Sequence, residues 1–142
     1  MLKLCACALS LLATCAVAQA DCDDAPGPAE NAVRRLVAPL AQHELDVCVF
    51  YGDYSGDGAE DAVVFFYFAD PNGGNSFDLE VTKLRQSDGR FRPDGLVEDV
   101  YGESPRDARF FEGRIEITMT TPQGDDPRCC PTGTTRYTID AR

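Results

Sequence analysis

The chain has 142 residues, of which 44% are hydrophobic, and it carries 24 acidic against 13 basic side chains, a formal net charge of −11 at pH 7. This length fits one ordinary domain. So acidic a surface makes nucleic acid and anionic membrane surfaces poor partners, and it favours cations or a basic protein.

The first twenty residues have the features of a secretory signal peptide. Lys3 supplies a positive start, residues 4–16 form a short apolar run, and Ala18-Gln19-Ala20 is a small-x-small cleavage pattern. We therefore expect a signal peptide over residues 1–20 and a periplasmic or secreted protein. The alternative is a lipid anchor at Cys15, because Leu12-Ala13-Thr14-Cys15 is similar to a lipoprotein processing box, although Thr14 is unfavourable there.

Cleavage after Ala20 leaves 122 residues with a formal charge of −12, because the leader contains one lysine and no acid. No later apolar stretch has the length of a membrane span. We expect an acidic lead-in over residues 21–27, followed by a single domain over residues 28–142.

A helix is expected near the start of this domain. Gly27-Pro28 resembles a helix start, because proline is favoured at the first helical position. The apolar residues that follow have the spacing of one helical stripe, and Pro39 should kink or end the helix. The stripe consists of Val33, Leu36, Val37 and Leu40.

After His43 the apolar period changes to the alternation of strands. Residues 62–69 contain no charge, which predicts a central strand covered on both faces. The sequence therefore predicts an α+β fold, with one N-terminal helix packed on a twisted antiparallel meander sheet of about six or seven strands. The other expected strands are residues 45–51, 77–82, a strand at Phe91, a hairpin around residues 110–119 and residues 135–139, with turns at residues 72–75 and 87–89.

Four of the seven cysteines remain after cleavage, an even number that predicts two disulfides in an oxidising compartment. A bridge between the adjacent Cys129 and Cys130 would strain the peptide between them. We therefore expect Cys22 and Cys48 each to pair with one member of that pair. Zinc and redox chemistry are disfavoured, because the chain has no CxxC and a single histidine.

The sharpest motif is the acidic loop Asp53-Tyr54-Ser55-Gly56-Asp57-Gly58-Ala59-Glu60-Asp61. Calcium binds six or more oxygen ligands, and oxygen side chains stand here at loop positions 1, 3, 5 and 9, with glycine at position 6. The expected ligands are Asp53, Ser55, Asp57, the Ala59 carbonyl and Asp61. The alternative is a turn in which aspartate side chains bind their own backbone without an ion.

An EF-hand is excluded, because position 12 of the loop is Val64 instead of glutamate. The loop resembles instead the short calcium loops of FG-GAP and integrin-type propeller repeats, where an acidic run precedes an apolar strand. This resemblance covers nine residues and the following strand. It implies a weakly bound structural Ca²⁺ ion, and a propeller is excluded because the motif occurs once.

The mature chain as a whole resembles a group of small exported bacterial proteins. The matching segments are Cys22-Asp23-Asp24, the loop from Gly52 to Ala62, Ser104-Pro105-Arg106-Asp107 and residues 126–132, which read DPRCCPT. The resemblance implies export and fold, and it implies no reaction.

Two functions are open at this stage. The first is a non-catalytic binding or envelope module, stiffened by disulfides and by Ca²⁺, in one version an inhibitor or immunity protein that captures a basic enzyme. The second is a small secreted hydrolase that uses a metal in the acidic loop.

We expect no catalytic residues, because His43 stands beside no nucleophile and the acids are spread along the chain. The aromatic run at residues 65–68 is either core on both faces or half of an exposed binding patch.

Overall fold

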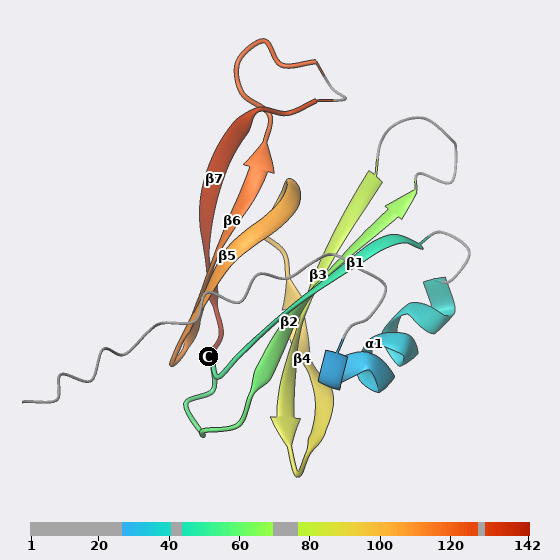
Figure 1. Cartoon of the computed structure of the whole chain (residues 1–142), viewed down its shortest axis with the longest axis vertical. Helices are drawn as coiled ribbons and strands as arrows, with labels where there is room; N and C mark the ends of the chain where they lie inside the picture. Colours follow the sequence, from blue (N-terminus) through green and yellow to red (C-terminus); the bar gives the residue numbers. More distant parts are fainter. Residues whose placement is uncertain (1–26, 41–43, 70–76, 128–129) are drawn as a thin grey trace, which may run out of the picture.

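The computed structural model describes residues 27–40, 44–69, 77–127 and 130–142 of the chain. Its elements form the predicted α+β fold, with one short helix and seven antiparallel strands in two sheets of four and three strands (Figure 1). In chain order the elements are η1 (Gly27–Ala29), α1 (Glu30–Val37), η2 (Ala38–Leu40), β1 (Glu44–Gly52), β2 (Asp61–Ala69), β3 (Phe77–Ser87), β4 (Arg90–Val97), β5 (Glu103–Phe111), β6 (Arg114–Thr121) and β7 (Gly133–Asp140).

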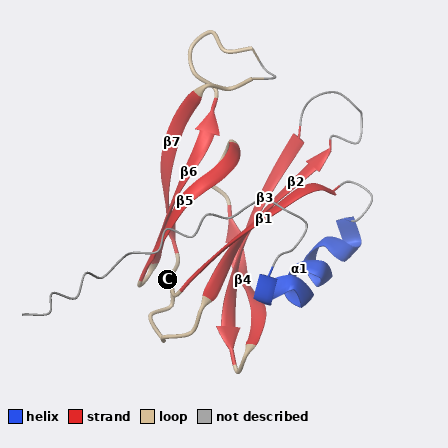
Figure 2. Cartoon of the chain, viewed as in Figure 1, coloured by secondary structure: helices blue, strands red, loops and turns tan. Residues whose placement is uncertain are grey.

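The strands follow one another as a meander within each sheet, in the orders β1-β2-β3-β4 and β5-β6-β7. The meander is broken between β4 and β5, where residues 98–102 carry the chain from one sheet to the other. Figure 2 shows the three-stranded sheet beside one face of the four-stranded sheet, with α1 against the other face. The molecule is therefore three layers: helix, sheet and sheet.

Each face of the four-stranded sheet has its own apolar core. The core between the sheets contains Phe50, Phe65 and Val81 from the first sheet and Ile115, Ile117 and Met119 from the second. The core under the helix joins Ala29, Ala32 and Val33 to strand residues of the opposite parity: Val49, Ala62, Val64, Phe66, Phe68, Leu84 and Phe91. Successive strand residues point to opposite faces, so one strand can supply both cores.

Strand β2 confirms the prediction of a strand covered on both faces. All residues from Asp61 to Phe68 are buried, and β2 pairs with β1 on one side and β3 on the other. The aromatic run is core on both faces, with Phe65 facing the second sheet and Phe66 facing the helix. The alternative of an exposed aromatic patch on this strand is therefore wrong.

The helix begins and ends near the predicted positions. A 3-10 turn at Gly27–Ala29 leads into α1, and the α-helix gives way to a second 3-10 turn at Ala38–Leu40, which contains Pro39. Proline has no N–H to donate and clashes with the preceding turn, which explains the change. The Ala29 amide donates to the hydroxyl of Tyr51 at 3.1 Å, and this bond ties the start of the helix to β1.

The turn predicted at residues 87–89 is confirmed. Ser87 pairs with Arg90, and the two residues between them have positive φ, 52° at Asp88 and 71° at Gly89. Both central residues of a two-residue type I′ hairpin need this conformation. The turn predicted at residues 72–75 and His43 lie outside the described residues.

A buried lysine lies on the inner face of the first sheet. Lys83 in β3 is 8% exposed, and its Nζ donates to the carbonyl oxygen of Asp140 at 3.2 Å. The same Nζ lies 5.9 Å from the centre of the Tyr54 ring, within the range of a cation–π contact. Lys83 thus bridges the two sheets near the ends of β1 and β7.

Candidate functional site

The acidic loop folds as a turn that is closed by hydrogen bonds to its own backbone. Asp53 Oδ1 accepts from the Gly56 amide at 2.6 Å and from Ser55 Oγ at 3.3 Å, and Asp53 Oδ2 accepts from the Gly58 amide at 2.8 Å. Gly56 and Gly58 have φ values of 76° and 83°, which glycine adopts without strain. Desolvation acts to raise the pKa of Asp53, but the bonds from Gly58, Gly56 and Ser55 outweigh it and lower that pKa.

Asp61 fastens this loop to the sheet. Its side chain is completely buried, and each carboxylate oxygen accepts one backbone amide: Oδ2 from Ser55 at 3.0 Å and Oδ1 from Gln86 at 2.9 Å. Because Ser55 belongs to the loop and Gln86 to β3, one carboxylate joins two segments far apart in the chain. Such bonds satisfy a buried charge that would otherwise be costly.

The structure brings three of the five expected calcium ligands together. Asp53, Ser55 and Asp61 share one hydrogen-bond network through their side chains and the Ser55 amide, whereas the Asp57 carboxylate accepts the Ala59 amide at 2.8 Å. In the described part of the chain, no group of three or more His, Cys, Asp or Glu side chains is arranged to hold a metal ion. These contacts are those of the ion-free turn, and Ca²⁺ binding stays a prediction.

Only part of the predicted disulfide framework lies within the described residues. Cys48 lies on β1 facing the second sheet, is 1% exposed and is disulfide-bonded. Cys22 and Cys129 lie outside the described residues, so the pairing of Cys22 and Cys48 with the Cys129/Cys130 pair stays a prediction.

A cavity of about 320 Å³ opens beside Cys48, at one end of the interface between the sheets. Its lining combines apolar and acidic side chains, with Tyr67 and Phe77 on the first sheet and Asp46 and Glu103 on β1 and β5. The two rings pack edge to face, with centroids 5.2 Å apart, and the Tyr67 hydroxyl donates to the Gly102 carbonyl at 3.3 Å. We call this space the acidic cavity.

The electrostatics of the acidic cavity follow from these neighbours. Burial raises the pKa of the Tyr67 hydroxyl, and the negative charges of Glu103 and Asp46 raise it further. Both carboxylates therefore act on the same phenol, although they come from different sheets. An aromatic wall beside two carboxylates is suited to the aliphatic stem and charged head of a lysine or arginine side chain.

Sequence reasoning did not single out Asp46 or Glu103. A signal for Asp46 was present, because Asp46 shares the parity of Cys48 and Phe50 and so falls on a face of β1 that is otherwise core. An acid on such a face calls for an explanation. Glu103 carried no such signal, because it lies at the start of a strand that the sequence pattern did not predict.

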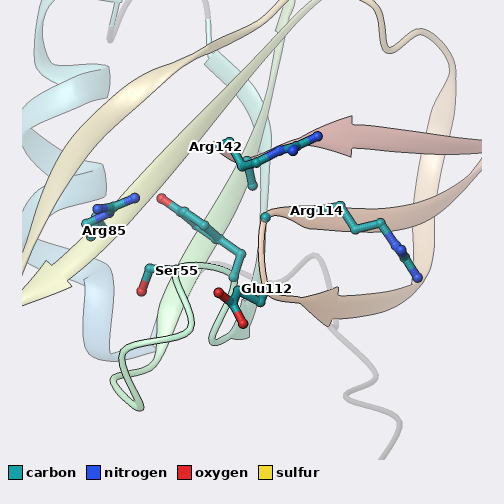
Figure 3. Close-up of a pocket in the computed structure, with 8 residues that line it drawn as sticks. Ser55, Arg85, Glu112, Arg114 and Arg142 are labelled. Atoms are coloured by element: carbon teal, nitrogen blue, oxygen red, sulfur yellow. The ribbon is translucent and has the colours of Figure 1, made fainter.

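A second cavity, of about 530 Å³, lies at the opposite end of the same interface. It is lined by residues of the acidic loop, β3, the β5–β6 turn and the end of the chain, and Figure 3 shows three arginines, Arg85, Arg114 and Arg142, around it. We call it the arginine cavity.

The comparisons with known proteins add no relative. The chain matches no family model, no curated protein and no solved structure. No helix in the described segments is long and apolar enough to cross a membrane.

Proposed function

We propose that this chain is an exported, non-catalytic binding module that captures a basic protein or envelope component. The observation that carries the proposal is the acidic cavity, where Asp46 and Glu103 stand beside the aromatic side chains of Tyr67 and Phe77. A lysine or arginine of the partner would place its stem against the rings and its charged head between the carboxylates. One version of the module is an inhibitor or immunity protein for a basic enzyme.

The charge of the whole chain supports the same kind of partner. The net charge of −11 attracts a basic protein over long range and accelerates encounter, while the cavity supplies the specific contact. The long-range part is screened by salt, whereas a contact inside a partly desolvated cavity is screened much less. Salt therefore separates the two contributions.

The stiffness of the cavity walls also supports binding. Tyr67 is held by its ring contact with Phe77 and by its bond to the Gly102 carbonyl, and the disulfide-bonded Cys48 lies in the same wall. A wall that is already ordered loses little conformational entropy when a ligand binds. The hydrolase alternative has no comparable observation in its favour among the described residues.

The test uses a short peptide with one arginine, Ac-Ala-Arg-Ala-amide, and its glutamine counterpart. In amide NMR spectra we expect saturable shifts at Tyr67, Phe77 and Gly102 with the arginine peptide, and none with the glutamine peptide. Asp46→Asn/Glu103→Gln should weaken binding at least tenfold, a loss of about 1.4 kcal/mol.

The matched control is Asp88→Asn/Glu98→Gln, which removes the same two negative charges at exposed positions away from the cavity. It should bind the arginine peptide within about twofold of the parent. Equal weakening by the two double variants would show that only net charge matters, and unlocalised shifts would remove the acidic cavity as the site.

A further inference from the structure

The arginine cavity has an arginine-rich lining in an acidic molecule. Its lining carries three guanidinium groups, from Arg85, Arg114 and Arg142, and one carboxylate, from Glu112. The chain as a whole has 24 acids and 13 bases, so three arginines around one cavity are unexpected on composition alone. Concave walls concentrate the field of such a cluster and raise the local concentration of anions.

The three arginines come from separate elements that meet only in the folded chain. Arg85 lies on β3, Arg114 opens β6, and Arg142 follows β7. Figure 3 shows Arg85 apart from Arg114 and Arg142, whose side chains extend away from Arg85. The guanidinium groups therefore stand on two sides of the cavity.

Each arginine is held loosely by one acid through its Nε atom. The Nε–carboxylate distances are 3.4 Å for Arg85–Asp94, 3.5 Å for Arg114–Glu116 and 3.6 Å for Arg142–Asp140. The arginine side chains are 45%, 51% and 83% exposed in the same order. Exposed pairs of this kind contribute about 0–1 kcal/mol, so an anionic ligand can compete with them.

Arg114 and Arg142 each approach their acid partner through Nε, on the edge of the guanidinium. The Arg114 guanidinium also stacks on the Phe111 ring, with 4.3 Å between Cζ and the ring centre. A guanidinium can bind a carboxylate or a phosphate with two parallel hydrogen bonds. Rotation about exposed side-chain bonds can direct both groups to a ligand in the cavity.

The other lining residues leave room for such a ligand. Tyr54 is fully buried and its hydroxyl donates to Asp94 at 3.0 Å, which fixes the ring as a wall. The Glu112 side chain packs on Gly56, where an added Cβ would stand 2.7 Å from Glu112 Cγ. Glu112 therefore lies against the acidic loop, beside Ser55 in Figure 3.

We propose that the arginine cavity binds a small polyanion with at least two carboxylate or phosphate groups. A volume of about 530 Å³ is that of a small-molecule site and exceeds what a single oxyanion fills. Because Arg85 stands apart from Arg114 and Arg142, a ligand with anionic groups at both ends can engage them together. This site is separate from the acidic cavity, which lies at the other end of the sheet interface and is lined by Asp46 and Glu103 instead of arginines.

The test titrates the chain, in metal-free buffer of constant ionic strength, with citrate, pyrophosphate and acetate. We expect saturable one-to-one binding of citrate or pyrophosphate by calorimetry, with NMR shifts at Ser55, Gly113 and Ala141. Acetate should bind at least tenfold more weakly. The tighter of the two polyanions identifies the preferred group, carboxylate or phosphate.

Two variants connect binding to the arginines. Arg142→Gln removes the most exposed of the three side chains and should fold as the parent does, and Arg85→Gln/Arg142→Gln should weaken polyanion binding at least tenfold. The matched control, Arg34→Gln/Arg35→Gln, removes two exposed charges from α1 and should change binding less than twofold. The proposal is overturned by no saturable binding of either polyanion, by acetate binding as tightly, or by equal losses in the control and the cavity variants.

Discussion

The two sheets of this molecule are built from similar strands but are covered differently. The four-stranded sheet lies between the helix and the second sheet, so its central strand β2 is buried from Asp61 to Phe68. The three-stranded sheet has only its inner face in the core, supplied by residues such as Ile115, Ile117 and Ile139. Among the described elements, none packs on its outer face, as Figure 1 shows.

The uncovered face of the second sheet carries charged side chains. Arg106, Thr118 and Arg136 are neighbours across β5, β6 and β7 on that face. The Arg106 guanidinium donates to Thr120 Oγ1 at 2.8 Å and to Thr134 Oγ1 at 3.2 Å, so it lies along the sheet. The comparison shows that coverage, more than strand length or pairing, decides which residues a strand can carry.

The largest expected effect comes from comparing a buried side chain of the first sheet with a side chain on the uncovered face of the second sheet. Phe66→Ala removes a ring that is 1% exposed beneath the helix and should lower the free energy of unfolding by about 3–5 kcal/mol. Arg136→Ala, on the open face of β7, should change it by at most about 0.5 kcal/mol. Urea denaturation measures both. A loss above about 2 kcal/mol for Arg136→Ala would show that this face is covered after all.

Asp61→Ala should have the next largest effect. It leaves the buried amides of Ser55 and Gln86 without their acceptor, and we expect a loss of about 2–4 kcal/mol, from two bonds to a charged group. Asp57→Ala is the matched control, because Asp57 is exposed and accepts one amide. It should cost about 1 kcal/mol or less in metal-free buffer. Equal losses in the two variants would contradict the role of Asp61 as the link between loop and sheet.

The calcium prediction is tested on the same loop, which belongs to the first sheet. If Asp53, Ser55, Asp57, Ala59 and Asp61 hold an ion, Ca²⁺ at ten times Kd should add about 1.4 kcal/mol and raise Tm by several degrees. Asp57→Ala should then lose this response. The hydrogen-bonded turn predicts the same Tm in Ca²⁺ and in chelator for both proteins, and scanning calorimetry distinguishes the two results.

The smallest effect concerns pH, through one aspartate in the loop of each sheet. Amide bonds from Thr132 and Gln123 lower the pKa of Asp126, and bonds from Gly58 and Gly56 overcome desolvation to lower that of Asp53. A carboxyl group whose pKa is lowered in the folded state adds stability at pH values above its pKa in the unfolded state. This stability is lost as the pH falls through the lowered pKa. Carboxyl NMR titration should therefore give both residues values below 3.8. A value at or above 3.8 would contradict the hydrogen bonds described for that residue.

Much of the first sheet could be predicted from sequence because its signals are local. The uncharged run of β2 and the Asp88-Gly89 turn each fix their own conformation, and Pro39 marks the place where the α-helix ends. The division into two sheets was not predictable in this way. It depends on the packing of β5–β7 against the first sheet and on residues 98–102, which carry no distinctive pattern.

Most of strand β5 was missed for a local reason, because the hairpin expected around residues 110–119 covers only its last two residues. Its sequence, ESPRDARFF, contains a proline and four charged residues, and Ser104 and Asp107 adopt positive φ values of 48° and 55°. The register shifts between Glu103 and Arg106 and again before Arg109, so the alternation of a regular strand is absent. Because Glu103 lies on this strand, the acidic cavity could not be assembled from sequence, whereas the acidic loop, which is continuous, could be.

The bridge formed by Lys83 has a consequence for how the protein can be handled chemically. The sequence has two lysines, Lys3 in the expected leader and Lys83 between the sheets. Within residues 27–142, amine-directed labels and cross-linkers will therefore find no exposed lysine while the domain is folded. The rate at which Lys83 is acylated therefore reports how often the two sheets separate. Mass spectrometry can follow this reaction at a single residue.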